Sequence, residues 1–293
     1  MVDFNHGVEL INKFHGSEVK TTLRLNDVVY MIKYPDPIRD KNNPLSYMNN
    51  QFSEHVGCRI FESCGIEAQA TQIGWFKDIR GSNRIVVGCV DFTQYGDILY
   101  EFSKLSNQVQ VYGKTGTSIE GVYDIIMGTR AITDKTAAIH KFWVMFVVDS
   151  LIGNTDRHFD NRGFIDKQGL GVLDFAPIYD CGSSLAALVS DEDMESLLND
   201  ESAFKSREYN LTSCYYLSKK RIFVHEIFKN PPKDLLDAFL ELYPKIDFAK
   251  IYKIIEDVEY MSEIRKKYML RAMELRYDLI FTKLYRLNAK QLN

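Results

Sequence analysis

The sequence lacks the marks of a secreted or membrane-bound protein. Its five cysteines are odd in number and form none of the close pairs of a zinc site or a redox motif, so we expect reduced thiols inside a cell. The longest strongly apolar run, residues 142 to 148, is far shorter than the roughly 18 residues that indicate a membrane span. No signal peptide with a charged and then an apolar part opens the sequence. These absences predict a soluble, cytoplasmic protein, although export by a non-standard route stays open.

The sequence also lacks an excess of positive charge. It has 36 lysines and arginines against 40 aspartates and glutamates, a net charge of -4, which argues against overall attraction to nucleic acid or acidic membranes. With 45% hydrophobic residues, the 293-residue chain can bury a core as one large domain or as two lobes that share a cleft. We therefore expect no direct nucleic-acid ligand and no membrane span, and the sequence does not indicate an oligomeric state.

The well-known phosphate-binding loops are missing as well. Neither a Walker lysine motif nor the three-glycine loop of protein kinases is present, and the loop before the first predicted strand, residues 15 to 20, holds a single glycine, Gly16. From its residues alone, this loop is typical of an ordinary turn.

What the chain does contain is a set of oxygen ligands at short spacing. Asp156 is followed five residues later by Asn161, and Asp180 lies beyond a predicted hairpin. Such a set can hold Mg²⁺ on a nucleoside triphosphate and orient a hydroxyl towards its γ-phosphate. The Asp-x-x-x-x-Asn spacing is that of the catalytic loop of protein kinases. Because the spacing alone is a weak signal, its context matters.

The context predicts a rigid frame. Residues 134 to 152 leave almost no polar face in their second half, which is typical of a helix inside a large core. Two short strands are predicted at residues 162 to 165 and 170 to 175, with a turn-like tetrad between them. We expect the helix to deliver the first aspartate and the asparagine to a loop, and the hairpin to deliver the second aspartate.

Two motifs carry a resemblance to a known family. They are Asn154-x-Asp156-Arg157-His158-x-x-Asn161 and Pro177-x-Tyr179-Asp180-x-Gly182-x-Ser184-Leu185. Together they resemble the HipA-like family of serine/threonine kinases, over about residues 15 to 185, while the C-terminal third carries no motif of the family. The resemblance implies an α+β, two-lobed, protein-kinase-like fold. Its small antiparallel-sheet N-lobe would comprise residues 1 to 92, and its mostly helical C-lobe residues 93 to 293.

Local patterns in the N-lobe agree with this expectation. Two segments rich in β-branched and aromatic residues, 19 to 25 and 28 to 33, flank the two-residue turn Asn26-Asp27. A helix is predicted from about residue 46 to residue 64, and two more strands at residues 67 to 76 and 84 to 92.

The resemblance assigns nucleotide contacts to this lobe. It implies that Gly16, Ser17 and Lys20 belong to the loop over the ATP phosphates, and that Lys33, at the end of the second strand, grips the α- and β-phosphates. By itself, a lysine at a strand end is most often solvated. One departure concerns regulation, because Lys13 stands where the family carries a phosphorylatable serine.

Glu54 and the connection between the lobes leave alternatives. Glu54 is either an exposed glutamate or, as in protein kinases, the ion-pair partner that positions Lys33. Val90-Asp91-Phe92 is the predicted connection, where backbone groups at Val90 and Phe92 would hydrogen-bond adenine while apolar side chains cover its rings. Phe92 is equally well explained as a core residue.

The catalytic-loop motif suggests one role for each residue. Asp156 is the base or orienting group for the substrate hydroxyl, and Asn161 and Asp180 are Mg²⁺ ligands, for which Mn²⁺ could substitute. A lone histidine is most often structural, whereas the family pattern assigns His158 to the nucleotide. Arg157 either pairs with a carboxylate or holds the loop.

A second aspartate competes with Asp180. The triplet Asp174-Phe175-Ala176 mimics the Asp-Phe-Gly triplet of protein kinases. Asp174 would lie within the second hairpin strand, however, whereas Asp180 follows Pro177 at the exit of that strand. We therefore favour Asp180 as the metal ligand and keep Asp174 as a structural or secondary ligand.

The remaining regions carry weaker signals. Residues 95 to 129 suggest a short helix, a polar loop and another helix, and the chain is expected to turn helical after Leu188, beginning with a solvated acidic run. Residues 261 to 293 have eight lysines and arginines against three acidic residues on a predicted amphipathic helix. The basic face of this helix is either solvated or a docking surface.

The sequence thus predicts an ATP- and Mg²⁺-dependent phosphotransferase. The resemblance makes it a serine/threonine protein kinase that transfers the γ-phosphate to protein hydroxyls, with autophosphorylation as a further expectation. The alternatives are a lipid or small-molecule kinase of the same fold and a non-catalytic nucleotide-binding interaction module. A metal-dependent hydrolase fits less well, because the remaining histidines show no paired spacing.

Overall fold

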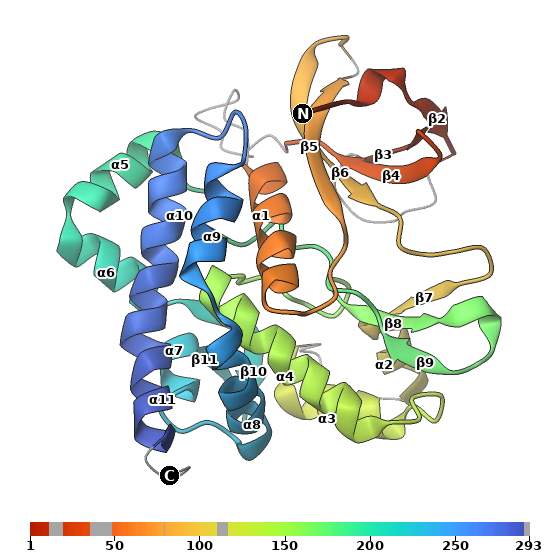
Figure 1. Cartoon of the computed structure of the whole chain (residues 1–293). Helices are drawn as coiled ribbons and strands as arrows, with labels where there is room; N and C mark the ends of the chain where they lie inside the picture. Colours follow the sequence, from red (N-terminus) through yellow and green to blue (C-terminus); the bar gives the residue numbers. More distant parts are fainter. Residues whose placement is uncertain (12–19, 36–48, 79, 110–116, 290–293) are drawn as a thin grey trace.

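The computed structural model describes residues 1–11, 20–35, 49–78, 80–109 and 117–289, which form a mixed α+β fold (Figure 1). An N-terminal sheet lies at one end, helices form a body at the other, and helix α1 (Asn50–Ser63) stands between them. None of the described helices has both the length and the apolar character that a membrane crossing requires. Three residues singled out from the sequence, Lys13, Gly16 and Ser17, lie outside the described residues.

Six strands form the N-terminal sheet, in the spatial order β1-β5-β6-β4-β3-β2. Their bounds are β1 Val2–Asp3, β2 Val8–Leu10, β3 Lys20–Leu25, β4 Val28–Lys33, β5 Thr71–Lys77 and β6 Asn83–Val90. The four predicted strands are present, but the sheet is not purely antiparallel, because β1 pairs in parallel with β5. The first two strands were not predicted, since segments this short cannot show an alternating pattern.

The turn between β3 and β4 sets the register at the centre of the sheet. Asn26 and Asp27 have φ values of 50° and 63°, the left-handed pair that a two-residue hairpin turn requires. The structure therefore contains the predicted hairpin. Its register places Lys20 opposite Lys33 at the end of the hairpin away from the turn. Both lysines therefore lie at the same end of the two strands.

One aromatic side chain closes the face of the sheet that is turned away from α1. Phe4, on the short 3₁₀ helix η1 (Phe4–His6), is fully buried in a cluster with Tyr30 and other sheet residues. A Cβ atom at Gly74 or Gly88 would lie only 2.4 or 2.3 Å from its ring. The ring therefore occupies space that only glycine leaves open.

Helix α1 joins the sheet to the helical body. Its end is followed by Gly65, whose φ of 78° suits glycine, while the predicted start near residue 46 lies outside the described residues. Phe52 and Ile60 of α1 belong to one hydrophobic cluster that also contains Val87 of β6 and Phe146 of the body. A single continuous core thus runs from the sheet through α1 into the body.

Helix α4 (Lys135–Ile152) is the central helix of the body. Asp134 caps its start by accepting a hydrogen bond of 2.8 Å from the Ala137 amide, and Gly153 ends it in the left-handed conformation with a φ of 67°. Nearly every residue from Phe142 to its end is buried. The predicted buried helix is present, and its end leads directly into the loop that holds Asp156.

The body adds further helices and two small sheets. Their bounds are β7 Ile98–Glu101, α2 Phe102–Val109, α3 Ile119–Gly128, β8 Gly163–Asp166, η2 Lys167–Gly169, β9 Leu173–Phe175, α5 Asp191–Asn199, α6 Glu201–Tyr209, β10 Thr212–Leu217, β11 Lys220–Phe223, α7 Val224–Ile227, α8 Lys233–Leu242 and η3 Tyr243–Lys245. Strand β8 pairs with both β7 and β9, so the predicted hairpin belongs to a three-stranded sheet.

The helices expected in these parts of the body are present, namely α2 and α3 within residues 95 to 129 and α5 shortly after Leu188. Two features were not predicted. One is strand β7 before α2, whose partner β8 lies far along the chain, and the other is the hairpin that β10 and β11 form. Its turn residues Ser218 and Lys219 have φ values of 48° and 66°. Since neither is glycine, asparagine or aspartate, the usual turn signal is missing from the sequence.

Four C-terminal elements pack along the body: α9 (Phe248–Glu256), α10 (Glu263–Arg276), the π-helix η4 (Tyr277–Phe281) and α11 (Thr282–Ala289). The predicted basic segment is helical, but two of its arginines are internal, each only 1% exposed. Arg276 donates from Nε to the Leu151 carbonyl at 2.8 Å and forms an ion pair with Glu208. Arg265 pairs with Asp191, in the acidic run, at 2.8 Å. The basic face is therefore partly used for packing.

Replacing Phe4 with alanine should lower the free energy of unfolding by about 3–5 kcal/mol, because a fully buried ring is lost and the two glycines below it cannot fill the cavity. Urea unfolding followed by circular dichroism measures this change. Val8→Ala on strand β2 is the control, because Val8 is 68% exposed, and it should change the same quantity by less than about 0.5 kcal/mol. Equal losses in both variants would contradict the packing described for Phe4.

Candidate active site

A cleft of about 550 Å³ lies between residues of the N-terminal sheet and residues of the helical body. Seven of the residues predicted for the site line it: Lys20, Lys33, Phe92, Asp156, His158, Asn161 and Asp180. The predicted residues Glu54 and Val90 do not line the cleft, although both contact residues that do. Side chains from widely separated parts of the sequence therefore meet at one hollow.

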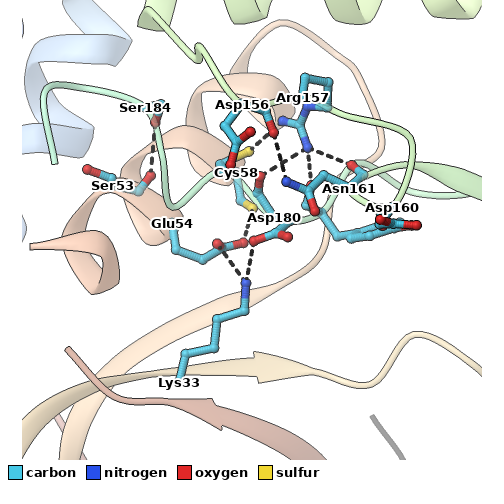
Figure 2. A network of polar contacts seen from close by, with 12 residues as sticks. Lys33, Ser53, Glu54, Cys58, Asp156, Arg157, Asp160, Asn161, Asp180 and Ser184 are labelled. Atoms are coloured by element: carbon cyan, nitrogen blue, oxygen red, sulfur yellow. Dashed lines mark hydrogen bonds and ion pairs between the residues drawn. The ribbon is translucent and has the colours of Figure 1, made fainter. Parts of the chain in front are cut away.

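Lys33 binds two carboxylates at the floor of this cleft (Figure 2). The lysine closes strand β4 and is 4% exposed, and its Nζ lies 3.0 Å from Glu54 Oε2 and 2.7 Å from Asp180 Oδ1. The predicted ion pair with Glu54 is present. The direct contact with Asp180 was not foreseen from the sequence, because it depends on how the loop after β9 passes α1.

The charges in this group compensate one another. Glu54 is fully buried on α1, where an ionised carboxylate needs a cation nearby. Burial by itself would raise the pKa of the Asp180 carboxyl, but Lys33, with smaller contributions from Arg157 and Lys20, holds that pKa below its ordinary value. Asp180 is therefore ionised at neutral pH, the state in which a carboxylate can hold a metal ion.

The loop that carries Asp180 is held in an uncommon backbone conformation. Asp180 has a φ of 61°, which costs free energy for a residue other than glycine and persists only when neighbouring contacts impose it. Before it, the Ile178 amide donates to the Glu67 carbonyl at 2.9 Å. After it, Cys181 passes so close to Gly57 of α1 that a Cβ at Gly57 would lie 2.6 Å from the Cys181 Cβ. The α1 region thus fixes the loop on both sides of Asp180.

Arg157 ties the two predicted motifs together. Its guanidinium is 1% exposed and pairs with Asp149 of α4, at 2.9 Å from Nε and 3.0 Å from Nη2. Its Nη1 donates to the Asn161 carbonyl at 3.0 Å and to the Asp180 carbonyl at 3.1 Å, and also to the Tyr179 carbonyl. The two roles left open by the sequence, pairing with a carboxylate and holding the loop, are therefore both filled.

The loop of the first motif places Asp156 and Asn161 next to each other. The Asn161 side-chain amide donates to the Asp156 carbonyl at 2.8 Å, which closes the loop. Burial, opposed by His158 and supported by Asp180, raises the pKa of the Asp156 carboxyl above its ordinary value. His158 Nε2 lies 3.9 Å from Asp156 Oδ2, and its Nδ1 lies 3.8 Å from Asp160 Oδ2. The histidine therefore stands between two carboxylates on the cleft wall.

Of the two competing aspartates, Asp180 lines the cleft and Asp174 does not. Asp174 lies on strand β9 opposite Ile165, its residue is exposed, and it does not line the cleft. Asp180 does line it, near Asn161. In the described part of the chain, no group of three or more histidine, cysteine or acidic side chains could hold a metal ion by itself. A carboxylate plus an amide oxygen still suits Mg²⁺, which takes its remaining ligands from phosphate and water.

The connection after β6 differs from the prediction at Val90. The Val90 amide donates to the Ala70 carbonyl at 2.8 Å, and its carbonyl accepts a hydrogen bond of 2.9 Å from the side chain of Gln69. Both polar backbone groups of Val90 are thus already engaged. Phe92 does line the cleft, and its ring centroid lies 5.8 Å from that of Tyr179.

Several residues that line the cleft were not singled out from the sequence. They are Met31, Gln69, Asp91, Thr93, Leu99, Glu101, Asp160, Tyr179 and Ser183. Three of them could have been found, because Tyr179 belongs to the second motif, Asp160 lies within the first motif and Asp91 belongs to the predicted connection. The others carry no local signal, since strand register and loop packing alone bring them to the cleft.

Comparison with known proteins gives relatives that cover nearly the whole chain. The model of the HipA-like C-terminal domain matches residues 13–235. The serine/threonine-protein kinase CtkA of Helicobacter pylori is 35% identical over 266 residues, which is 89% of this chain and 80% of the relative.

Solved structures agree with these matches. The crystal structure of the proinflammatory kinase CtkA of Helicobacter pylori superposes with a TM-score of 0.89 at 31% identity, covering 99% of this chain and 98% of the other. Shewanella oneidensis HipA, solved in a complex with HipB and operator DNA, has a TM-score of 0.55 at 12% identity over 94% of this chain and 65% of the other, and shows a shared fold only. The chain belongs to the HipA-like kinase family and is a homologue of the serine/threonine-protein kinase CtkA.

Proposed function

We propose that this protein is an ATP- and Mg²⁺-dependent serine/threonine kinase whose acceptors are protein hydroxyls. The observation that carries the proposal is the amine of Lys33, bonded to both Glu54 and Asp180 in the cleft that also holds Asp156. Phosphoryl transfer needs mainly positioning and charge neutralisation, and this set supplies both. We also propose that residues 1–92 and 93–293 act as the two lobes of the enzyme, with the cleft between them.

Five polar side chains of the site have a role in the proposed reaction. Lys33 would hold the α- and β-phosphates while Glu54 keeps its amine in place. Asp180 and Asn161 would hold Mg²⁺, which neutralises charge on the phosphates when it is bound. Asp156 would orient the acceptor hydroxyl and take its proton, a task favoured by a pKa above that of an ordinary aspartate.

The choice of acceptor rests on the relatives. CtkA is named a serine/threonine-protein kinase, which favours protein hydroxyls over lipids or small molecules.

Alanine at Asp156 or at Asp180 should reduce phosphoryl transfer by at least about 100-fold, because the first change removes the proton acceptor and the second a metal ligand. Transfer of labelled phosphate from ATP to a generic basic protein, with phosphoamino-acid analysis of the product, measures this loss. Asp174→Ala is the matched control and should keep wild-type transfer, since Asp174 is exposed outside the cleft.

Three results would overturn the protein-kinase proposal or redirect it. Nucleotide binding without any transfer by the wild type would favour the interaction module. Transfer only to lipids or small molecules would favour the alternative acceptor class. A loss of transfer in Asp174→Ala but not in Asp180→Ala would mean that Asp174, and not Asp180, is the metal ligand.

Glu54→Gln should lower kcat/KM for ATP by about 10- to 100-fold, because a neutral amide holds the Lys33 amine less firmly than a carboxylate at 3.0 Å. Steady-state kinetics with varied ATP concentration tests this. The control is Glu62→Gln on the same helix, whose carboxylate pairs with Arg59 outside the cleft and should leave the kinetics unchanged. Equal kinetics for wild type and Glu54→Gln would show that Glu54 does not position Lys33 for ATP.

A further inference from the structure

One polar side chain of the cleft has an acceptor without a partner. Gln69 lies just before β5, is 3% exposed and lines the cleft. Its side-chain Nε2 donates to the Val90 carbonyl at 2.9 Å. Its Oε1 is buried and accepts no hydrogen bond from any residue that the structure describes. Buried polar atoms in folded proteins almost always find a partner, so this oxygen calls for a donor.

The orientation of this amide follows from its surroundings. A backbone carbonyl can only accept a hydrogen bond, so the nitrogen of the Gln69 side chain must face Val90 and the oxygen must face away from it. The Gln69 backbone is fixed as well, because its amide donates to the Ile178 carbonyl at 2.7 Å. Gln69 is therefore held at its backbone and at its side-chain nitrogen, which fixes the position of its unpartnered oxygen.

The position of the acceptor suits the base of a nucleotide rather than its phosphates. Gln69 is bonded to the last residue of β6, directly before the connection to the body. Met31, Phe92 and Leu99 line the same cleft with apolar side chains that can cover a planar ring. The charged group around Lys33 suits the phosphates of a nucleotide. The base would therefore bind at the other end of the cleft, among the apolar side chains.

We propose that Gln69 selects adenine by accepting a hydrogen bond from its 6-amino group, an inference that rests on the proposed ATP-binding function. Adenine carries a donor at position 6, whereas guanine and hypoxanthine carry a carbonyl acceptor there. An acceptor placed opposite Gln69 Oε1 would leave two oxygens unpaired in a buried site. Gln69 covers the carbonyl of Val90 and offers its own oxygen in place of it.

Nucleotide binding to the wild-type protein gives the first test. Isothermal titration calorimetry with Mg²⁺ and ATP, ITP or N6,N6-dimethyl-ATP compares bases of which only adenine carries an N–H donor at position 6. ITP also has a proton on N1, whereas the dimethylated base keeps N1 as an acceptor, so the two analogues together isolate the donor at position 6. We expect ITP and the dimethylated nucleotide, neither of which can donate there, to bind about 10- to 100-fold more weakly than ATP. Equal affinity for ATP and ITP would overturn the assignment.

A substitution at Gln69 gives the second test. Gln69→Met keeps the length of the side chain but removes its acceptor, so ATP affinity should fall about three- to tenfold while ITP affinity does not fall, and the ratio of the two should approach one. Gln72→Met on β5 is the matched control, because Gln72 is exposed and does not line the cleft. It should keep the wild-type ratio.

The outcomes separate this inference from the proposed function. If the wild-type protein binds no ATP, the proposed function fails and the role of Gln69 fails with it. If ATP binds but Gln69→Met keeps the wild-type preference for ATP over ITP, only the role of Gln69 fails. Thermal denaturation checks that the variants fold, and should Gln69→Met be unfolded, the nucleotide series on the wild type decides alone.

Discussion

The contact on which the whole arrangement depends is the Lys33 amine held between Glu54 and Asp180. It joins the sheet, helix α1 and the loop after β9, three segments far apart in the sequence. Burying such charges is costly unless each meets its partner, so the group forms only when all three segments are packed correctly. The continuous core through α1 and the close approach at Gly57 provide that packing. The charged group of the cleft therefore forms only in a correctly folded chain.

Two buried arginines, Arg157 and Arg162, make hydrogen bonds to the backbone of the loop that carries Asp156 and Asn161. Arg157 links the loop to α4 and to the backbone at Asp180, and Arg162 donates to the Arg157 carbonyl at 2.9 Å. Burial lowers the pKa of Arg162 to about 9. Its guanidinium lies 4.6 to 5.4 Å from the ring centroids of Phe102, Phe142, Phe159 and Tyr215, where a cation is stabilised by aromatic faces. Neither arginine was assigned a definite role from the sequence.

The sequence predicted best where the signal was local. The turn at Asn26-Asp27 and the apolar run of α4 each specify their structure within a few residues, and the structure contains both. It predicted poorly where partners are distant, as for β7, whose strand character depends on β8, and for Gln69, whose position depends on the path of the loop at Ile178. The motif around Asp156 and Asp180 named the residues that meet, whereas the contacts that bring them together had to come from the fold.

The ion pair and carbonyl contact of Arg276 have a consequence for the order in which the protein matures. Arg276, near the C-terminal end of the chain, caps Leu151 at the end of α4, just before the catalytic loop. During synthesis, everything from the first strand to the loop of Asp180 leaves the ribosome before this arginine does. The end of α4 would then lack this support until Arg276 has emerged, so a nascent chain would acquire a fully braced loop at Asp156 only after α10 has been made.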